Sequence, residues 1–326
     1  MIFIELVAGL VLLLVCGDLF VRGAVGVAEA LKVSPLVIGL TLVGFGTSLP
    51  ELVASLEAAR LGAPGIAVGN VVGSNIANVL LILGVAALIS PIAVSAGTFR
   101  LNGPVLLGAS LLAVFIFYLG TIGRIGGLAL LLLLAAFTFA AWWSGRQGGD
   151  DPGLRHLAEE IEDTPPRRAP LVVYLALTVG GLVGIVFGAN LLVQGAVALA
   201  RQVGISDTVI GLTVVAVGTS LPELATSVVA AIRRHGDVAL GNVIGSNIFN
   251  ILGILGATAL YRPIAVPEEI IQLDSWVMLL AAVLVIVFSM TRAKVERWEG
   301  ALLLGGYAAY LAVLLVTPLR AGLGLS

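Results

Sequence analysis

The sequence predicts an all-α polytopic membrane protein with ten transmembrane helices in two inverted-topology repeats of five, in which helices 2 and 7 are broken. Three observations support this prediction. The 326 residues are 59% hydrophobic and only 11% charged, whereas about 25% of residues are charged in typical soluble proteins. Apolar segments of transmembrane length recur along the chain, and the second half of the sequence repeats the first. So apolar a chain cannot cover itself with a polar surface, and we expect it to lie in a lipid bilayer.

The first half contains five apolar segments, each long enough for the roughly 20 residues that cross a bilayer. We expect these transmembrane helices near residues 2–31, 34–60, 66–89, 102–119 and 124–143. The first segment lacks a positively charged leading region and a small-residue cleavage site, so we expect it to be retained as a span and not removed as a signal peptide.

A polar segment at residues 144–170 separates the two halves. It holds 10 of the 36 charged residues, with glycines at one end and prolines at the other, which is typical of a solvated linker. The predicted domains are therefore a first repeat at 1–143, this linker, and a second repeat at 171–326. The second repeat should contain five more spans, near residues 171–200, 205–232, 238–261, 273–290 and 297–317.

The two halves are copies at a constant offset of 172 residues. The motif GTSLPEL at 46–52 recurs at 218–224, and GNVVGSN at 69–75 returns as GNVIGSN at 241–247. Over a longer window, residues 37–55 match their counterparts at 14 of 19 positions. Because each repeat has an odd number of spans, the second copy must enter the membrane from the opposite side, as in many secondary transporters.

The distribution of basic residues predicts the orientation. If the N-terminus is outside, the inner loops and span ends hold 11 Lys and Arg residues and the outer ones hold 5. This excess follows the positive-inside rule. We therefore expect a multi-pass protein of the plasma (inner) membrane, with both termini outside and the central linker in the cytoplasm.

Three carboxylates lie inside predicted spans, where a charged group is unfavourable by about 2.5–3.5 kcal/mol and therefore suggests function. Glu51 and Glu223 occupy matching positions of the repeated GTSLPEL motif, with no basic residue in either span to neutralise them. Asp18 differs, because Arg22 follows it by four residues and can form an ion pair on the same helix. The matched glutamates are thus the primary candidates for a functional site.

A proline directly precedes each of these glutamates, at Pro50 and Pro222. Proline lacks an N–H group and leaves the carbonyl four residues back unpaired, so helices 2 and 7 should break there and offer carbonyl oxygens beside a carboxylate. A threonine and a serine at i−4 and i−3 should lie on the same helical face as each glutamate. These residues are Thr47, Ser48, Thr219 and Ser220.

A second polar stripe follows in spans 3 and 8, where polar residues are spaced by four. They are Asn70, Ser74 and Asn78 in the first repeat and Asn242, Ser246 and Asn250 in the second. Small residues beside them should let these helices press closely against the broken ones. They are Gly69, Gly73, Gly241 and Gly245. For Asn75 and Asn247 of the same motif, a packing role and a polar role are equally open.

All of these groups offer oxygen atoms, which are the ligands that hard cations such as Ca²⁺ and Na⁺ prefer. The two histidines, His156 and His235, fall in predicted loops, and Cys16 is the single cysteine, so soft ligands are not expected near the site. The sequence therefore predicts a buried cation site that both repeats share.

The motifs GTSLPELVAS with GNVVGSNIANVLLILG, and GTSLPELATS with GNVIGSNIFNILGILG, resemble the two alpha-repeats of the cation/Ca²⁺ exchanger superfamily, specifically its prokaryotic sodium/calcium exchangers. The resemblance implies a Ca²⁺ site made of two carboxylates and two main-chain carbonyls, those of Glu51, Glu223, Thr47 and Thr219. It implies flanking Na⁺ sites made of four serine hydroxyls and two carbonyls, those of Ser48, Ser74, Ser220, Ser246, Gly44 and Ala216. It further implies that Asn78 and Asn250 line the middle, although some relatives carry Asp at the second of these positions.

The function that the resemblance implies is antiport of Ca²⁺ against Na⁺ by alternating access, with no cofactor and no obligate protein partner. A Ca²⁺/H⁺ antiporter on the same scaffold is the alternative, although that branch of the superfamily resembles GNAxE and not GTSLPE. A cation channel is a remote alternative, since channels arrange rings of ligands around an open pore. The net charge of −2 gives no basic excess for nucleic acid, and the spans lack the residue pairs of an intramembrane protease, so we do not expect an enzyme.

Overall fold

The computed structural model describes residues 2–31, 39–62, 64–94, 96–147, 169–202, 216–291 and 293–315. These residues are almost entirely helical, with short two-residue strands between helices. The first half contains α1 (Ile2–Leu31), η1 (Gly39–Val43), α3 (Gly44–Thr47), α4 (Leu49–Arg60), α5 (Pro64–Ala77), η2 (Asn78–Leu83), α6 (Gly84–Ile89), β1 (Ile92–Ala93), α7 (Ala96–Tyr118), β2 (Thr121–Ile122) and α8 (Arg124–Gln147).

The second half has the same order of elements. It contains α10 (Leu171–Gln202), α12 (Ala216–Thr219), α13 (Leu221–Ile232), α14 (Gly236–Ile248), η4 (Phe249–Ile254), α15 (Leu255–Tyr261), β3 (Ile264–Ala265), η5 (Ile270–Asp274), α16 (Ser275–Thr291), β4 (Lys294–Val295) and α17 (Arg297–Leu315).

In the part of the chain that the structure describes, seven helical segments are long and apolar enough to cross a membrane. They are Ile4–Val27, Pro64–Ile89, Leu101–Tyr118, Arg124–Trp143, Leu171–Gly188, Gly236–Tyr261 and Ile270–Met290. The multi-pass architecture is thus confirmed, and the count of ten spans stays a prediction. The starts of predicted spans 2 and 7 lie outside the described residues, as does most of the predicted linker, and α8 extends four residues into that linker, to Gln147.

Two long helical rods form the centre of the bundle. One consists of α5, η2 and α6, and the other of α14, η4 and α15. They are the most buried of the candidate spans, and each contains a π-helical segment, at Asn78–Leu83 and Phe249–Ile254. A π-turn inserts an extra residue into the helix and often marks a functional site. Both rods thus change their helical geometry at matching places.

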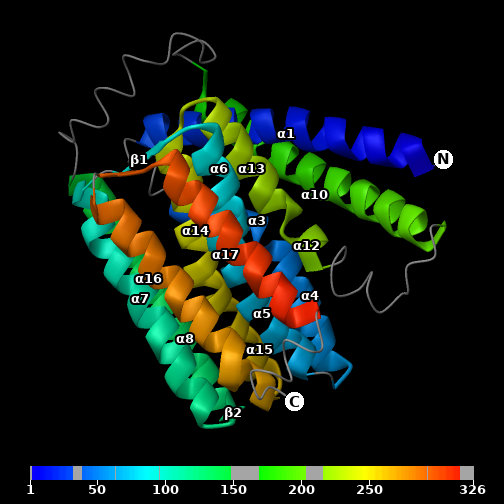
Figure 1. Cartoon of the computed structure of the whole chain (residues 1–326). Coiled ribbons are helices and arrows are strands. Elements are labelled where there is room, and N and C mark those ends of the chain that lie inside the picture. Colours follow the sequence, from blue (N-terminus) through cyan, green and yellow to red (C-terminus); the bar gives the residue numbers. More distant parts are fainter. Residues whose placement is uncertain are drawn as a thin grey trace.

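The first and sixth predicted spans, α1 and α10, pack against each other as an antiparallel pair that crosses one side of the bundle (Figure 1). Their backbones approach closely at glycines. A Cβ atom on Gly23 would lie 2.5 Å from the backbone nitrogen of Thr178, and one on Gly181 would lie 2.6 Å from that of Phe20. Only glycine fits at these two positions, so α1 and α10 form one tightly packed unit.

The short strands join the two halves. Strand β1 pairs antiparallel with β4, and β2 pairs antiparallel with β3, with Ile92 opposite Val295 and Ile122 opposite Ile264. Strands β1 and β3 are the two copies of the repeated PIAV sequence. Yet β1 lies at one end of the bundle and β2, the partner of β3, lies at the other (Figure 1). Equivalent loops therefore lie at opposite ends of the molecule.

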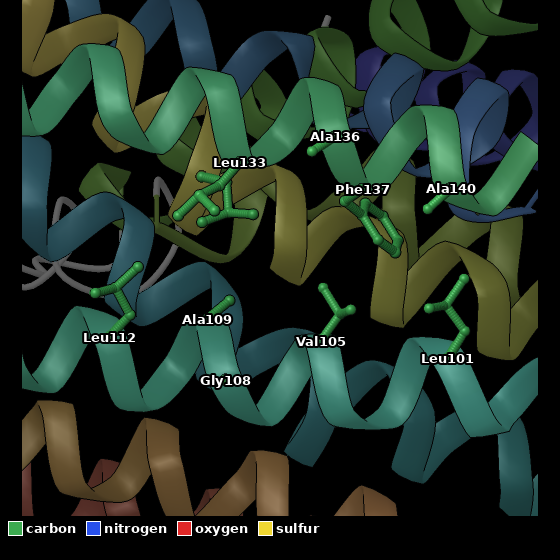
Figure 2. Close-up of a pocket in the computed structure, with 10 residues that line it drawn as sticks. Leu101, Val105, Gly108, Ala109, Leu112, Leu133, Ala136, Phe137 and Ala140 are labelled. Carbon is green, nitrogen blue, oxygen red and sulfur yellow. The ribbon is translucent and has the colours of Figure 1, made fainter.

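Each half also has an apolar cavity between its last two helices. One, of about 400 Å³, lies between α7 and α8, where Val105 and Leu112 point towards Leu133 and Phe137 (Figure 2). The other, of about 250 Å³, lies between α16 and α17. Residues 101, 105, 109 and 112 line the first cavity, and residues 273, 277, 281 and 284 line the second, each 172 positions further along. The two halves thus share their packing defects as well as their helices.

Candidate cation-binding site

The helices that carry the two glutamates are interrupted at matching serines. A helix ends at Thr47 and another begins at Leu49, so Ser48 lies in the turn between them. In the same way Ser220 lies between α12 and α13. The break lies two residues before the proline at each site, where the proline cannot donate the next helical hydrogen bond.

The two repeats exchange hydrogen bonds through these serines. The hydroxyl of Ser48 donates to a carboxylate oxygen of Glu223 at 2.9 Å, and the hydroxyl of Ser220 donates to one of Glu51 at 3.4 Å. Our expectation that each serine shares a helical face with the glutamate of its own repeat was therefore wrong. The turn at each serine interrupts the helical register and directs the hydroxyl to the opposite repeat. Each of the four side chains is at most 3% exposed.

An asparagine from the second polar stripe braces each broken helix. The side-chain amide of Asn70 donates to the main-chain carbonyl of Glu51 at 3.1 Å and to the hydroxyl of Ser55 at 2.9 Å. Asn242 donates to the carbonyl of Glu223 at 3.2 Å and to Ser227 at 2.8 Å. The predicted stripe thus contacts the broken helices in both repeats.

Further contacts cross between the repeats on one side only. The hydroxyl of Thr47 donates to the side-chain oxygen of Asn242 at 3.1 Å, and that of Ser246 donates to the carbonyl of Gly44 at 3.0 Å. A Cβ atom on Gly44 would lie 2.8 Å from the backbone nitrogen of Ser246 and 3.0 Å from the carbonyl carbon of Gly245. Here a small residue does permit the close approach that we predicted.

The prediction of close packing was wrong for the glycines of the first repeat. A Cβ atom on Gly69 or on Gly73 would meet no described atom within 4 Å. The reason is that the two repeats pack differently around the site: α3 and η1 lie against α14, and the matching contact of α12 with α5 is less extensive.

Four asparagine side chains meet where the two central rods cross. Asn78 donates to the side-chain oxygen of Asn247 at 3.0 Å, and Asn250 donates to that of Asn75 at 3.5 Å. All four side chains are at most 3% exposed. The sequence left the roles of Asn75 and Asn247 open, and the structure shows that they hydrogen-bond the two predicted site asparagines. The matching offset of all four positions was the signal in the sequence.

Four buried oxygen atoms in this region have no hydrogen-bond partner. They belong to two pairs of side chains that are 172 residues apart: Glu51 with Glu223, and Asn78 with Asn250. In each case one atom of the group is engaged, by Ser220, Ser48, Asn247 or Asn75, and the other oxygen is not. Buried acceptors without a donor are rare, because they lose hydration without replacement. A cation would satisfy all four.

Three further predicted site residues lie on the same elements. Ser74 is buried on α5, Thr219 ends α12 before the turn, and Ala216 begins α12, although its side chain lies outside the described residues. Among the residues that the structure describes, no group of three or more His, Cys, Asp or Glu side chains is arranged to hold a metal ion. The candidate ligands are thus two carboxylates supplemented by neutral oxygens.

Asp18 lies outside this cluster. The predicted ion pair with Arg22 is confirmed, with 2.9 Å between the guanidinium nitrogen and a carboxylate oxygen. The other carboxylate oxygen pairs with Arg233, just beyond the end of α13. Sequence reasoning missed this second partner, because no local pattern links two residues that are 215 positions apart.

A fourth intramembrane carboxylate was also missed. Asp274, at the start of the ninth predicted span, accepts a hydrogen bond from the hydroxyl of Tyr310 at 3.0 Å. It follows the uncharged residues of a predicted span end, so its depth in the membrane could not be assigned from the sequence. It neighbours the cavity between α16 and α17, not the oxygen cluster.

The fold and this interior define the class of protein. Large apolar side chains such as Ile4, Phe115 and Leu132 are exposed on the outer helices, while acidic and amide side chains are buried at the centre. This distribution is the reverse of that in a soluble protein and defines a multi-pass membrane protein with a polar interior.

Comparison with known proteins identifies the family. The family described as sodium/calcium exchanger protein matches residues 1–143 and 173–316, and the chain belongs to this family of transporters. It is 39% identical over 345 residues to the sodium/calcium exchanger MaX1 of Methanosarcina acetivorans, covering 96% of this chain and 98% of that protein. It is 37% identical to the inner membrane protein YrbG of Escherichia coli, covering 95% of each.

Solved structures agree with this assignment. The fold is similar to that of the sodium-calcium exchanger NCX_Mj soaked with 2.5 mM Na⁺ and 1 mM Sr²⁺, with a TM-score of 0.81 and 36% sequence identity. The match covers 94% of this chain and 96% of that one. The chain is therefore a transporter and not an enzyme.

Proposed function

We propose that this protein is a secondary antiporter that exchanges Ca²⁺ for Na⁺ across the membrane at one buried site that both repeats share. The single observation that carries the proposal is the set of four unpartnered oxygens of Glu51, Glu223, Asn78 and Asn250. Two carboxylates balance the charge of one Ca²⁺, and carboxylate and amide oxygens are its preferred ligands. Membership of the sodium/calcium exchanger family supports the same substrates.

The remaining predicted ligands complete the proposed site. The carbonyls of Thr47 and Thr219 would join the glutamates around Ca²⁺. Na⁺ would use serine hydroxyls with the carbonyls of Gly44 and Ala216. The serines in this role are Ser48, Ser74, Ser220 and Ser246. The hydrogen bond from Ser246 to the carbonyl of Gly44 supports this grouping, because it holds two of the proposed Na⁺ ligands together.

We infer the same two-repeat architecture as the sequence predicts: spans 1–5 in residues 1–143, a cytoplasmic linker at 144–170, and spans 6–10 in 171–326, with both termini outside. The strand pairs support the inverted topology, since the equivalent strands β1 and β3 take part in pairs at opposite ends of the bundle. The matched linings of the two apolar cavities support the twofold relation of the halves.

Exchange would proceed by alternating access, in which α1 and α10 move as a unit against the central rods. An asymmetry supports this mechanism. Helix α1 packs along α13, whereas α10 makes no comparable contact with α4 among the described residues. In a twofold design, the second access state would exchange these two relations. Ca²⁺ and Na⁺ would compete for the same oxygens, and this competition would couple their movements.

The test is uptake of radioactive Ca²⁺ into proteoliposomes loaded with Na⁺, without a pH gradient. We expect uptake to follow the Na⁺ gradient and to saturate with Ca²⁺. Uptake that requires a pH gradient and ignores Na⁺ would instead favour a Ca²⁺/H⁺ antiporter, and uptake that does not saturate would favour a channel.

The same assay tests the site. E51Q and E223Q each remove one of the two charges that balance Ca²⁺, and we expect each to lower uptake by at least about 100-fold, since a buried divalent ion depends on its paired charges. E268Q, at an exposed carboxylate that contacts only Gln272, is the matched control and should transport normally. Full exchange in both site variants would disprove the proposed site.

A further inference from the structure

The four asparagines at the crossing of the central rods differ in what they contact. One oxygen each of Asn78 and Asn250 has no partner, whereas the side chains of Asn75 and Asn247 are engaged at both ends. An asparagine amide has an accepting oxygen at one end and a donating NH₂ group at the other, and a half-turn of the side chain exchanges them. Which end faces a cation therefore decides whether the side chain attracts or repels it.

One chain of hydrogen bonds determines the orientation of Asn78. It begins at the main-chain carbonyl of Asn75, which can only accept, so the NH₂ group of Asn247 must face it, at 3.2 Å. The side-chain oxygen of Asn247 then faces Asn78, which must present its NH₂ group there, at 3.0 Å. This leaves the oxygen of Asn78 as the free end, buried and without a donor.

A second chain determines the orientation of Asn250. It begins at the thioether sulfur of Met278, which has no hydrogen to donate. The NH₂ group of Asn75 faces this sulfur at 3.7 Å, so its oxygen faces Asn250. Asn250 presents its NH₂ group to that oxygen at 3.5 Å, and its own oxygen is left free. Both chains thus start from a group that can only accept and end in an unpartnered amide oxygen.

We propose that Asn247, Asn75 and Met278 are positioning residues that keep the side-chain oxygens of Asn78 and Asn250 directed at the transported cation. This inference rests on the proposed function, and it assigns a role to three residues outside the predicted ligand set. Without these anchors, each amide can turn and direct its NH₂ group at the cation, which repels it. The affinity for the cation then falls, while the glutamates and the helices that move are unchanged.

The two chains are unequal, which makes the proposal testable from the sequence itself. Asn247 is anchored by a main-chain carbonyl, which no substitution of a side chain removes. Asn75 is anchored by Met278, and the residue at the matching position of the first repeat is Leu106, which is also fully buried. M278L therefore removes the acceptor, keeps the side chain apolar and of similar volume, and uses the residue that the other repeat already has.

The experiment measures the KM for Ca²⁺ and the maximal rate of Na⁺-driven Ca²⁺ uptake in proteoliposomes. For M278L and for N247L we expect the KM to rise by about three- to tenfold, with the maximal rate within about twofold of wild type, because one orienting hydrogen bond biases an equilibrium by roughly this factor. M290L, at an exposed methionine of the same helix, is the control and should keep the wild-type KM.

A carboxylate in place of the amide distinguishes orientation from packing. In the N250D background both ends of the side chain are oxygens, so orientation no longer matters, and adding M278L should change the KM by less than about twofold. The N78D background with N247L gives a second, independent test of the same kind. A rise in KM of equal size in both backgrounds would show a packing role and overturn the proposal.

The outcomes also separate this proposal from the proposed function. If E51Q and E223Q retain full exchange, the cation site itself is wrong. If they abolish exchange while M278L and N247L leave the KM for Ca²⁺ unchanged, the site stands and the positioning role is wrong.

Discussion

The two repeats are nearly identical around the glutamates and differ away from them. Asn70 and Asn242 make the same two hydrogen bonds, to the carbonyl of the neighbouring glutamate and to a serine, with lengths that agree within about 0.1 Å. The bonds from Ser48 to Glu223 and from Ser220 to Glu51 are likewise reciprocal. The matched part of the molecule is thus the part that surrounds the unpartnered oxygens.

The unmatched part surrounds this centre. Gly44 corresponds to Ala216, and the ion-paired Asp18, Arg22 and Arg233 correspond to uncharged residues. This difference teaches that a shared cation site needs a twofold set of ligands, whereas the surrounding contacts need not obey the twofold relation. Contacts that only one repeat can make stabilise one arrangement of the repeats over its mirror arrangement, and thereby bias the access equilibrium.

The largest expected effect of removing a difference is at Gly44. G44A gives the first repeat the residue of the second, and its Cβ would lie 2.8 Å from the nitrogen of Ser246, which is backbone and cannot turn away. We expect α3 and α14 to separate, the bond from Ser246 to the Gly44 carbonyl to break, and the protein to lose about 1–3 kcal/mol of stability, with transport at least about tenfold slower.

A216G is the reciprocal variant and supplies the control. It removes one methyl group from a short helix, and we expect a loss of at most about 1 kcal/mol from the greater freedom of glycine. Thermal unfolding in detergent and Ca²⁺ uptake measure both variants. Equal behaviour of G44A and A216G would contradict the asymmetry at this contact.

An intermediate effect is expected at the ion pairs of Asp18. D18N removes the charge that bridges Arg22 on α1 and Arg233 after α13, and the pairs are only partly shielded from solvent. We expect a loss of about 0.5–1.5 kcal/mol of stability, because two guanidinium groups lose their partner. The KM for Ca²⁺ should stay within about twofold of wild type, since Asp18 does not contact the oxygen cluster.

The counterpart of Asp18 in the second repeat is Asn190, so N190A is the matched control and should leave stability nearly unchanged. Loss of Ca²⁺ uptake in D18N protein that unfolds at the wild-type temperature would place Asp18 in the transport machinery and contradict our assignment.

These comparisons also show which features the sequence could predict. Spans, breaks and polar stripes depend on local periodicity, and the two glutamates stand out because their surroundings recur after 172 residues. The partners across the repeats could not be predicted in this way. Helical spacing assigned Ser48 to Glu51, but a one-residue turn redirects it to Glu223. The pairing of Asp18 with Arg233 likewise depends on how α1 crosses α13, which no local pattern encodes.

The smallest expected effect is a pH dependence that one repeat has and the other lacks. His235 precedes α14 outside the membrane-spanning segment, and its counterpart is Ala63, which does not titrate. Burial, and secondarily the positive charge of Arg233, lower the pKa of His235 below its usual 6.5. The folded protein therefore holds this imidazole neutral, while the unfolded chain protonates it more readily.

The sign of the effect follows from this difference. The contribution of neutral His235 to stability is present above about pH 6.5 and is lost as the pH falls through the lower pKa of the folded state, because the unfolded state then binds the extra proton. H235A, which makes the two repeats alike at this position, should remove that part of the pH dependence. The measurement is the unfolding temperature in detergent between neutral and mildly acidic pH, with H156A as the control for the other histidine. We expect wild type and H156A to lose about 1–3 °C more than H235A over this interval, and a parallel decline in all three proteins would show that His235 does not contribute.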